Sequence, residues 1–159
     1  MTFMLHSSAF QRLGTIPKEC TCEGADRAPP LNWSGAPKGT KSFALIVDDP
    51  DAPDPAAPTH TFVHWVLYDL PAKTTSLPPM DPFPPGTRQG KNDTRRTGWS
   101  GPCPPRGKHR YFFKLYALDV MLGDLRQPTK QQLEQAMEGH VLASAELVGM
   151  YEKKKSPLA

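Results

Sequence analysis

Prolines divide this sequence into short apolar runs joined by long irregular segments. Proline accounts for 19 of the 159 residues, more than twice its ordinary share of about 5%. Because proline is excluded from helix interiors and from central strands, regular structure can form only between the prolines. Those intervals are rich in β-branched and aromatic residues, above all residues 43–47, 60–70 and 111–118. The pattern therefore predicts a mostly β domain with long, stiff loops.

Apolar side chains locate the individual strands. We expect strands at residues 3–10, 42–49, 60–71, 111–119 and 144–151, with a shorter one around Leu31 and Trp33. The run at 60–71 leaves no polar face, which predicts a strand that is covered on both sides of its sheet. Residues 72–107 have no sustained periodicity, and a loop of that length in a compact domain usually serves a function.

One helix is predicted towards the C-terminus. Thr129 and Gln132 have the spacing of a capping box. Residues at helical intervals follow it, namely Leu133, Met137, His140 and Val141, although Gly139 is a weak point in that pattern. The sequence has no internal repeat and no compositional boundary. Residues 1–159 are therefore predicted to form a single domain, with the basic residues 153–155 in a solvated tail.

Charge and hydropathy exclude several classes of protein. No stretch approaches the ~18 consecutive apolar residues of a membrane helix, so stable membrane insertion is not expected. The N-terminal residues lack the basic and long apolar regions of a signal peptide, which predicts a cytoplasmic protein. The formal charge is only +3 and the basic residues are scattered, so nucleic-acid binding is not indicated.

The three cysteines, Cys20, Cys22 and Cys103, form no recognisable metal site or disulfide framework. Their odd number argues against a full set of disulfides, and no second pair completes a zinc site with Cys20 and Cys22. His60 and His64 are four residues apart, which on a strand separates them by roughly 13 Å at ~3.3 Å per residue. We therefore expect reduced, partly buried thiols, no metal and no cofactor.

His64 lies in the middle of an apolar run. On a regular strand its side chain would point the same way as those of Phe62, Val66 and Tyr68. Such a histidine is either a hydrogen-bonded core residue or part of a buried polar site, and its position alone does not decide between the two.

Other polar groups favour the buried site. His109 and Tyr111 lie two residues apart at the start of an apolar run, which puts an imidazole and a phenol on one face. Asp49 ends another such run, where a buried carboxylate needs hydrogen-bond donors, and the imidazole of His64 is a suitable one. The alternative is that the aspartates of this segment only cap turns beside proline. The convergence of these groups predicts a small polar pocket.

The segment at residues 98–105, Gly-Trp-Ser-Gly-Pro-Cys-Pro-Pro, is the third component of the predicted pocket. Gly101 allows a backbone N–H to come close to a ligand, and Pro102 with the later prolines stiffens the segment. An ordinary rigid loop is the alternative interpretation.

Four motifs in this order resemble the phosphatidylethanolamine-binding protein family, in particular its compact bacterial, Raf-kinase-inhibitor-like branch. They are Asp-Pro-Asp-Ala-Pro at 49–53, a histidine in an aromatic strand that ends in Leu-Pro, Gly-Pro-Cys-Pro-Pro at 101–105, and Lys-His-Arg-Tyr at 108–111. The similarity covers nearly the whole chain. It implies a large β-sheet packed on a smaller one, with one or two peripheral helices.

The resemblance also implies a small cavity that binds phosphate, phosphoryl headgroups such as phosphorylethanolamine, or carboxylates. The matching positions are Asp49, His64, Gly101, Pro102, His109 and Tyr111. The backbone N–H of Gly101 is expected to meet the anion, and the Ala52–Pro53 bond is expected to be cis. Phe62 and Asp69 depart from the family pattern, in which Trp and Asn, respectively, are common at these positions. A long C-terminal segment that covers the cavity, as in the animal members of the family, is not expected.

Two functions are weighed for this pocket. The first, implied by the resemblance, is non-catalytic binding of a small anion with a regulatory role towards a kinase or a peptidase. The alternative is a hydrolase acting on phosphoryl or acyl groups at the same His/Asp pocket, but Pro102 breaks the G-x-S-x-G elbow around Ser100. Bacterial members of the family imply a homodimer, and the sequence identifies no protein partner.

Overall fold

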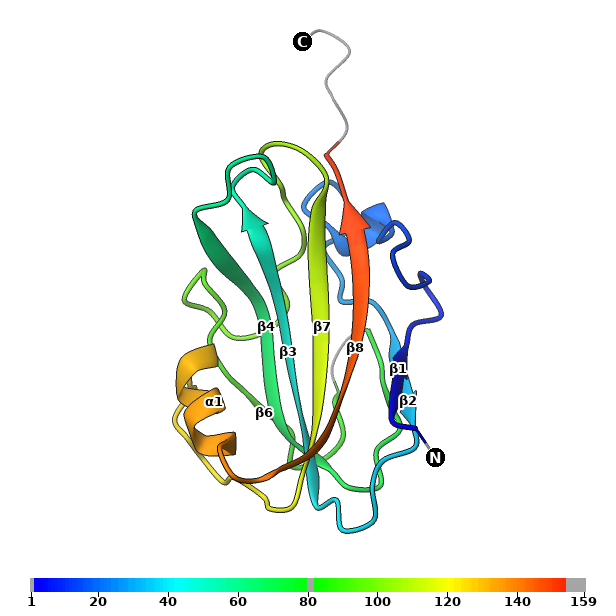
Figure 1. Cartoon of the computed structure of the whole chain (residues 1–159), viewed down its shortest axis with the longest axis vertical. Coiled ribbons are helices and arrows are strands. Elements are labelled where there is room, and N and C mark those ends of the chain that lie inside the picture. Colours follow the sequence, from blue (N-terminus) through cyan, green and yellow to red (C-terminus); the bar gives the residue numbers. More distant parts are fainter. Residues whose placement is uncertain (1, 80–81, 154–159) are drawn as a thin grey trace, which may run out of the picture.

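Two antiparallel β-sheets pack against each other in the computed structural model, which describes residues 2–79 and 82–153 (Figure 1). Within these residues, the larger sheet has the strand order β6 (Arg88–Gln89), β4 (His60–Pro71), β3 (Ser42–Ala52), β7 (His109–Leu118) and β8 (Val141–Tyr151). The smaller sheet has the order β1 (Met4–His6), β2 (Leu31–Ser34) and β5 (Ser76–Leu77). A 3-10 turn, η1 (Lys18–Cys20), and a helix, α1 (Lys130–Met137), accompany them. The predicted fold, a larger sheet on a smaller one with little helix, is confirmed.

Alternation along β3 explains why its run is continuously apolar. Phe43 and Leu45 point into the core between the two sheets, whereas Ala44 and Ile46 point to the opposite face of the larger sheet. The helix α1 covers that opposite face (Figure 1). Both faces of the larger sheet are therefore buried near its middle, which also accounts for the missing polar face of β4.

Several elements differ from their predicted bounds. The strand expected at 3–10 is shorter, because the hydroxyl of Ser7 accepts the N–H of Ala9 and turns the chain out of β1. The helix ends at Met137, since Gly139 has a left-handed φ of 81°. Val141 therefore begins β8 instead of extending the helix, and the long segment before β7 contributes the short strands β5 and β6.

Asp69 closes the end of β4 and lies away from the cavity described below. It has a left-handed φ of 54°, a conformation that Asp and Asn tolerate better than most residues. Its carboxylate accepts hydrogen bonds from the N–H groups of Leu122 and Gly123 and from Nε of Arg88. This departure from the family pattern thus acts on the bonding at the end of the strand.

No helix within the described residues is long and apolar enough to cross a membrane. Of the tail predicted at residues 153–155, residues 154 and 155 lie outside the described part of the chain.

The predicted capping box of α1 is present. The hydroxyl of Thr129 accepts the N–H of Gln132, and Oε1 of Gln132 accepts the N–H of Thr129. We expect Thr129→Ala to lower the free energy of unfolding by about 1 kcal/mol, because it removes an acceptor from the helix N-terminus. Gln131→Ala, at an exposed position of the same helix, is the control and is expected to change it by less than about 0.5 kcal/mol. Urea unfolding measures both variants, and equal stabilities would contradict the prediction.

Candidate functional site

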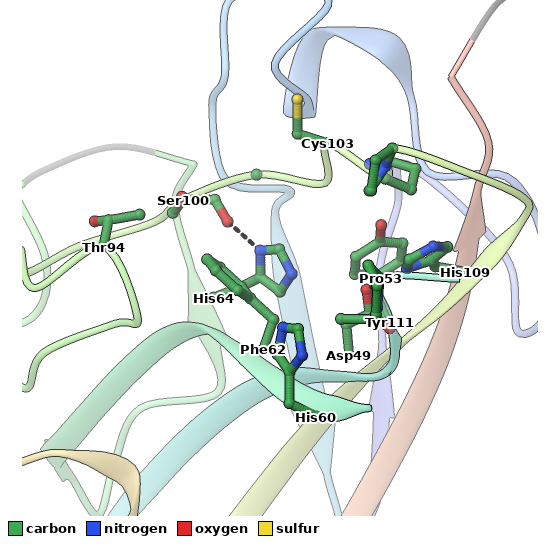
Figure 2. Close-up of a pocket in the computed structure, with 14 residues that line it drawn as sticks. Asp49, Pro53, His60, Phe62, His64, Thr94, Ser100, Cys103, His109 and Tyr111 are labelled. Carbon is green, nitrogen blue, oxygen red and sulfur yellow. Dashed lines mark hydrogen bonds and ion pairs between the residues drawn. The ribbon is translucent and has the colours of Figure 1, made fainter. Parts of the chain in front are cut away.

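A cavity of about 360 Å³ opens where β3, β4 and β7 meet the segment at residues 100–105 (Figure 2). Five of the six predicted binding residues line it: Asp49 from β3, His64 from β4, Gly101 from the segment, and His109 and Tyr111 from β7. The sixth, Pro102, is buried beside the cavity, and its carbonyl accepts the N–H of Cys22. The structure thus brings together side chains from three strands, and their binding of a ligand stays a prediction.

A β-bulge in β4 turns His64 towards this cavity. Between Trp65 and Val63, which pair with consecutive residues of β3, β4 has one extra residue, and that residue is His64. A bulge interrupts the two-residue alternation, so His64 lies on the same side of the sheet as its neighbour Trp65. The prediction that His64 points the same way as Val66 and Tyr68 is therefore wrong, because those two side chains pack beneath α1.

Asp49 forms a buried ion pair with His109 and does not orient His64 as predicted. Oδ2 of Asp49 lies 2.6 Å from Nδ1 of His109, and its Oδ1 accepts the N–H of Asp51 at 2.7 Å. The other nitrogen of His109, Nε2, lies 2.7 Å from the carbonyl oxygen of Arg106. Both ring nitrogens thus face oxygen atoms, an arrangement that matches an imidazolium beside an ionised Asp49. The correction arises because β7, not β4, brings an imidazole within reach of this carboxylate.

The ring of His64 is held by the backbone of the neighbouring segment. Nδ1 lies 2.5 Å from the carbonyl oxygen of Ser100, and since a carbonyl only accepts, Nδ1 carries the proton of this bond. Burial lowers the pKa of His64 below its usual range, although the Ser100 carbonyl and three nearby carboxylates act in the opposite direction. The neutral ring therefore has its hydrogen on Nδ1 and a lone pair on Nε2.

Tyr111 presents its hydroxyl to the same cavity. Its ring meets that of His64 edge-on, with the ring centroids 5.2 Å apart. Burial and the charges of Asp49 and Asp51 raise the pKa of Tyr111 well above its usual range, so the hydroxyl keeps its proton. Of the buried side-chain polar atoms in the described residues, four lack a hydrogen-bond partner, and two of these are Oη of Tyr111 and Nε2 of His64. Two atoms of this kind on residues that line one cavity indicate a place for a polar ligand.

The backbone N–H of Gly101 does not meet the cavity in the predicted way. It donates a hydrogen bond of 2.8 Å to Oδ1 of Asp26, in the segment that follows η1. A Cβ at position 101 would collide with that carboxylate and with the carbonyl of Cys20, so glycine is required for this close approach. The expected anion contact through this N–H is thus corrected, because a carboxylate of the protein itself already occupies it.

Cys22 and Cys103 form a disulfide, with their Cα atoms 5.4 Å apart, so the prediction of reduced thiols is wrong for this pair. The bond ties the cavity wall at Cys103 to the segment that supplies Asp26. An odd number of cysteines argues against a full framework, but it does not exclude one disulfide beside one free thiol. Cys20 is that thiol, and burial raises its pKa to about 11.

The residues that the structure describes contain no group of three or more His, Cys, Asp or Glu side chains arranged to hold a metal ion. Apolar residues complete the cavity walls, namely Ala52, Pro53, Phe62, Pro104 and Pro105. The Ala52–Pro53 bond is cis, as predicted. These prolines belong to two of the four motifs that carried the family resemblance, at 49–53 and 101–105. The motifs therefore mark them as wall residues once the path of both loops is known. His60, at the exposed rim, carries no comparable signal.

Comparison with known proteins identifies one family for this chain. The family model described as "Phosphatidylethanolamine-binding protein" matches residues 6–152. The chain belongs to the phosphatidylethanolamine-binding protein family. A UPF0098 protein of Methanothermobacter thermautotrophicus is 45% identical over 153 residues, covering 94% of this chain and 98% of the relative. A UPF0098 protein of Aquifex aeolicus is 46% identical, covering 92% of this chain and 86% of the relative.

Solved structures of this family have the same fold. The crystal structure of a phosphatidylethanolamine-binding protein homologue from Chlamydia trachomatis, CT736, aligns with a TM-score of 0.89 at 42% identity, over 96% of this chain and 99% of that one. The crystal structure of E. coli YbcL, described as a member of the mammalian family, aligns with a TM-score of 0.86 at 32% identity, over 97% of this chain and all of that one (100%). The resemblance to the phosphatidylethanolamine-binding protein family inferred from the four motifs is thereby confirmed.

Proposed function

We propose that this protein binds one small oxyanion in the cavity between β3, β4 and β7, and that it acts by binding and not by turnover. The candidate ligands are phosphate, a phosphoryl headgroup such as phosphorylethanolamine, and a carboxylate. The proposal rests on the two buried polar atoms that line this cavity without a protein partner, Oη of Tyr111 and Nε2 of His64. Buried polar groups are normally hydrogen-bonded, so these two would find their partner in a ligand or in ordered water.

The walls of the cavity fit a small polar head on an apolar stem. Its volume of about 360 Å³ is at the lower end of the range of small-molecule sites. Phe62, Pro53 and Pro104 offer apolar contacts beside the polar end. The carboxylate of Asp49 repels an anion less than an isolated charge would, because it is paired with His109.

The hydrogen bond of His64 favours binding over the hydrolase alternative. A serine hydrolase needs the serine hydroxyl beside the imidazole, whereas Nδ1 of His64 contacts the carbonyl oxygen of Ser100. In this proposal the cavity holds an anionic group of a partner, such as a phosphorylated side chain or a C-terminal carboxylate. By this route the protein would modulate a kinase or a peptidase.

We expect Tyr111→Phe to weaken binding of phosphate and phosphorylethanolamine by about tenfold or more, since hydrogen bonds to charged groups contribute about 1.5–3 kcal/mol. The ring stays in place and only the hydroxyl is lost, so the fold should be retained. Tyr116→Phe is the matched control, because Tyr116 lies on the same strand but packs on the opposite face of the sheet. Titration calorimetry measures both variants, and equal affinities would mean that the Tyr111 hydroxyl does not touch the ligand.

A cytoplasmic location and a homodimer also remain proposals from the sequence. The disulfide between Cys22 and Cys103 bears on the location, because disulfides persist in oxidising compartments and are rare in the cytosol outside hyperthermophiles. Thiol trapping of Cys22 and Cys103 in fractionated source cells tests the cytoplasmic location, and recovery of the protein outside the cytoplasmic fraction would contradict that location. Light scattering of the purified chain distinguishes a monomer from a homodimer.

A further inference from the structure

We infer that the cavity takes up one proton with each oxyanion that it binds, and that this proton lies between the ligand and Nε2 of His64. The inference rests on the proposed anion binding and specifies the form in which the anion is bound. The ligand class is an oxyacid that keeps one proton when bound, or a fully ionised oxyanion that binds beside an imidazolium. The two descriptions differ only in which side of one hydrogen bond holds the proton.

The hydrogen bond to Ser100 determines what His64 offers to a ligand. Because Nδ1 donates to the Ser100 carbonyl, the single proton of a neutral ring is not on Nε2. Nε2 then presents a lone pair, which repels the lone pairs of an ionised oxygen at hydrogen-bond distance. The hydroxyl of Tyr111, in contrast, is a donor. An acceptor and a donor in one cavity match an O–H and an O⁻ of the same ligand, and a bare anion fits only after His64 has gained a proton.

The surrounding charges point to the same requirement. The titratable groups that act on His64 or line the cavity beside it are Asp48 and Asp49 of β3, Asp93 of the loop after β6, His109 and Tyr111 of β7, and His60 of β4 itself. The three carboxylates favour a positive His64, but burial outweighs them before an anion binds. The imidazolium of His109 is already balanced by Asp49 and contacts the Arg106 carbonyl with its other nitrogen. An anion that enters this cavity therefore needs a new positive charge, and Nε2 is the unpartnered buried nitrogen that can supply it.

Proton uptake makes the affinity depend on pH with a definite sign. The complex holds one proton more than the separate protein and anion, so lower pH favours the complex. Above the pKa of His64 before binding and below its pKa in the complex, the dissociation constant should rise about tenfold per pH unit for an anion that does not itself titrate.

Titration calorimetry of the full chain with sulfate tests this inference. Sulfate is the probe because it stays fully ionised where histidine titrates, between about pH 5.5 and about pH 8. Binding heats measured at one pH in buffers of different ionisation enthalpy yield the number of protons taken up. We expect uptake approaching one proton per sulfate near neutral pH, with the affinity falling as the pH rises.

Two variants identify where the proton goes. His64→Gln keeps a polar side chain that does not titrate, and it is expected to bind sulfate without proton uptake. Tyr111→Phe is the matched control, because it removes a donor from the same cavity and should weaken binding while leaving the uptake per sulfate unchanged. NMR titration of the His64 ring in the unsubstituted protein answers the same question if His64→Gln does not fold, since added sulfate should raise the pKa of His64.

The outcomes separate this inference from the proposed function. Sulfate binding without proton uptake, or uptake that persists in His64→Gln, overturns the inference and leaves anion binding intact. An unchanged His64 pKa at saturating sulfate has the same consequence. Failure of sulfate, phosphate, phosphorylethanolamine and acetate to bind anywhere between about pH 5.5 and about pH 8 overturns the proposed function, and the inference with it.

Discussion

Replacing Asp49 with alanine is expected to lower the free energy of unfolding by about 3–5 kcal/mol, because it leaves a buried charge without its partner. The side chain of His109 is 1% exposed, and Asp49 is its counter-ion. The substitution also removes the acceptor for the N–H of Asp51. Without that counter-ion, a buried imidazolium keeps only its contact with the Arg106 carbonyl, which does not compensate for its lost hydration. Urea unfolding at neutral pH measures the loss.

Asp119 provides a matched control on the surface. Its carboxylate lies 2.9 Å from Nδ1 of His140, and these side chains are 43% and 42% exposed. Asp119→Ala removes the same kind of pair at a position that is in contact with water. It is expected to lower the free energy of unfolding by less than about 1 kcal/mol. Equal losses in Asp49→Ala and Asp119→Ala would show that the Asp49–His109 pair does not stabilise the fold as a buried ion pair.

Breaking the disulfide between Cys22 and Cys103 is expected to lower the free energy of unfolding by about 4 kcal/mol, from the entropy regained by the unfolded chain. The two cysteines are 81 residues apart, so the disulfide closes a long loop. The folded state should change little, because the N–H of Cys22 still donates to Pro102 and that of Gly101 to Asp26. The Cys22→Ser/Cys103→Ser double variant and the reduced protein should therefore be folded and similarly destabilised.

Urea unfolding with and without a reductant tests the disulfide. The reductant should destabilise the unsubstituted protein and leave the double variant unaffected. Cys20→Ala serves as the control for loss of a thiol, because Cys20 is buried and outside the disulfide, so the reductant should still destabilise this variant. A reductant without effect on the unsubstituted protein would mean that Cys22 and Cys103 are not bonded in solution.

Local patterns in the sequence were sufficient for most of the secondary structure. β4 has the predicted bounds, β7 begins two residues before the predicted start (His109 instead of 111), and α1 begins at the predicted capping box. Apolar alternation and capping depend on neighbouring residues, so they need no tertiary information. The end of α1 was missed because His140 and Val141 continue the helical spacing, whereas the left-handed Gly139 ends the helix.

Membership of the cavity was also predictable, but its contacts were not. The motifs identified Asp49, His109 and Tyr111 as polar groups at the ends of buried runs and His64 as one inside such a run, and all four line one cavity. Which imidazole meets Asp49 depends on strand order and register, since β3 pairs with both β4 and β7. The sequence contains both histidines and no signal that ranks their distances from the carboxylate.

The sequence by itself determined that carboxylate, imidazole and phenol groups are attached to strands that must be buried, because the burial of an apolar run follows from its own residues. Only the tertiary structure decided that a bulge turns His64 across the sheet, that Asp26 takes the N–H of Gly101, and that Cys22 reaches Cys103. The bulge shifts the pairing between two strands, and the other two features are contacts between segments that are distant in the chain. Their distances are set by register and by the packing of the two sheets, which no local pattern encodes.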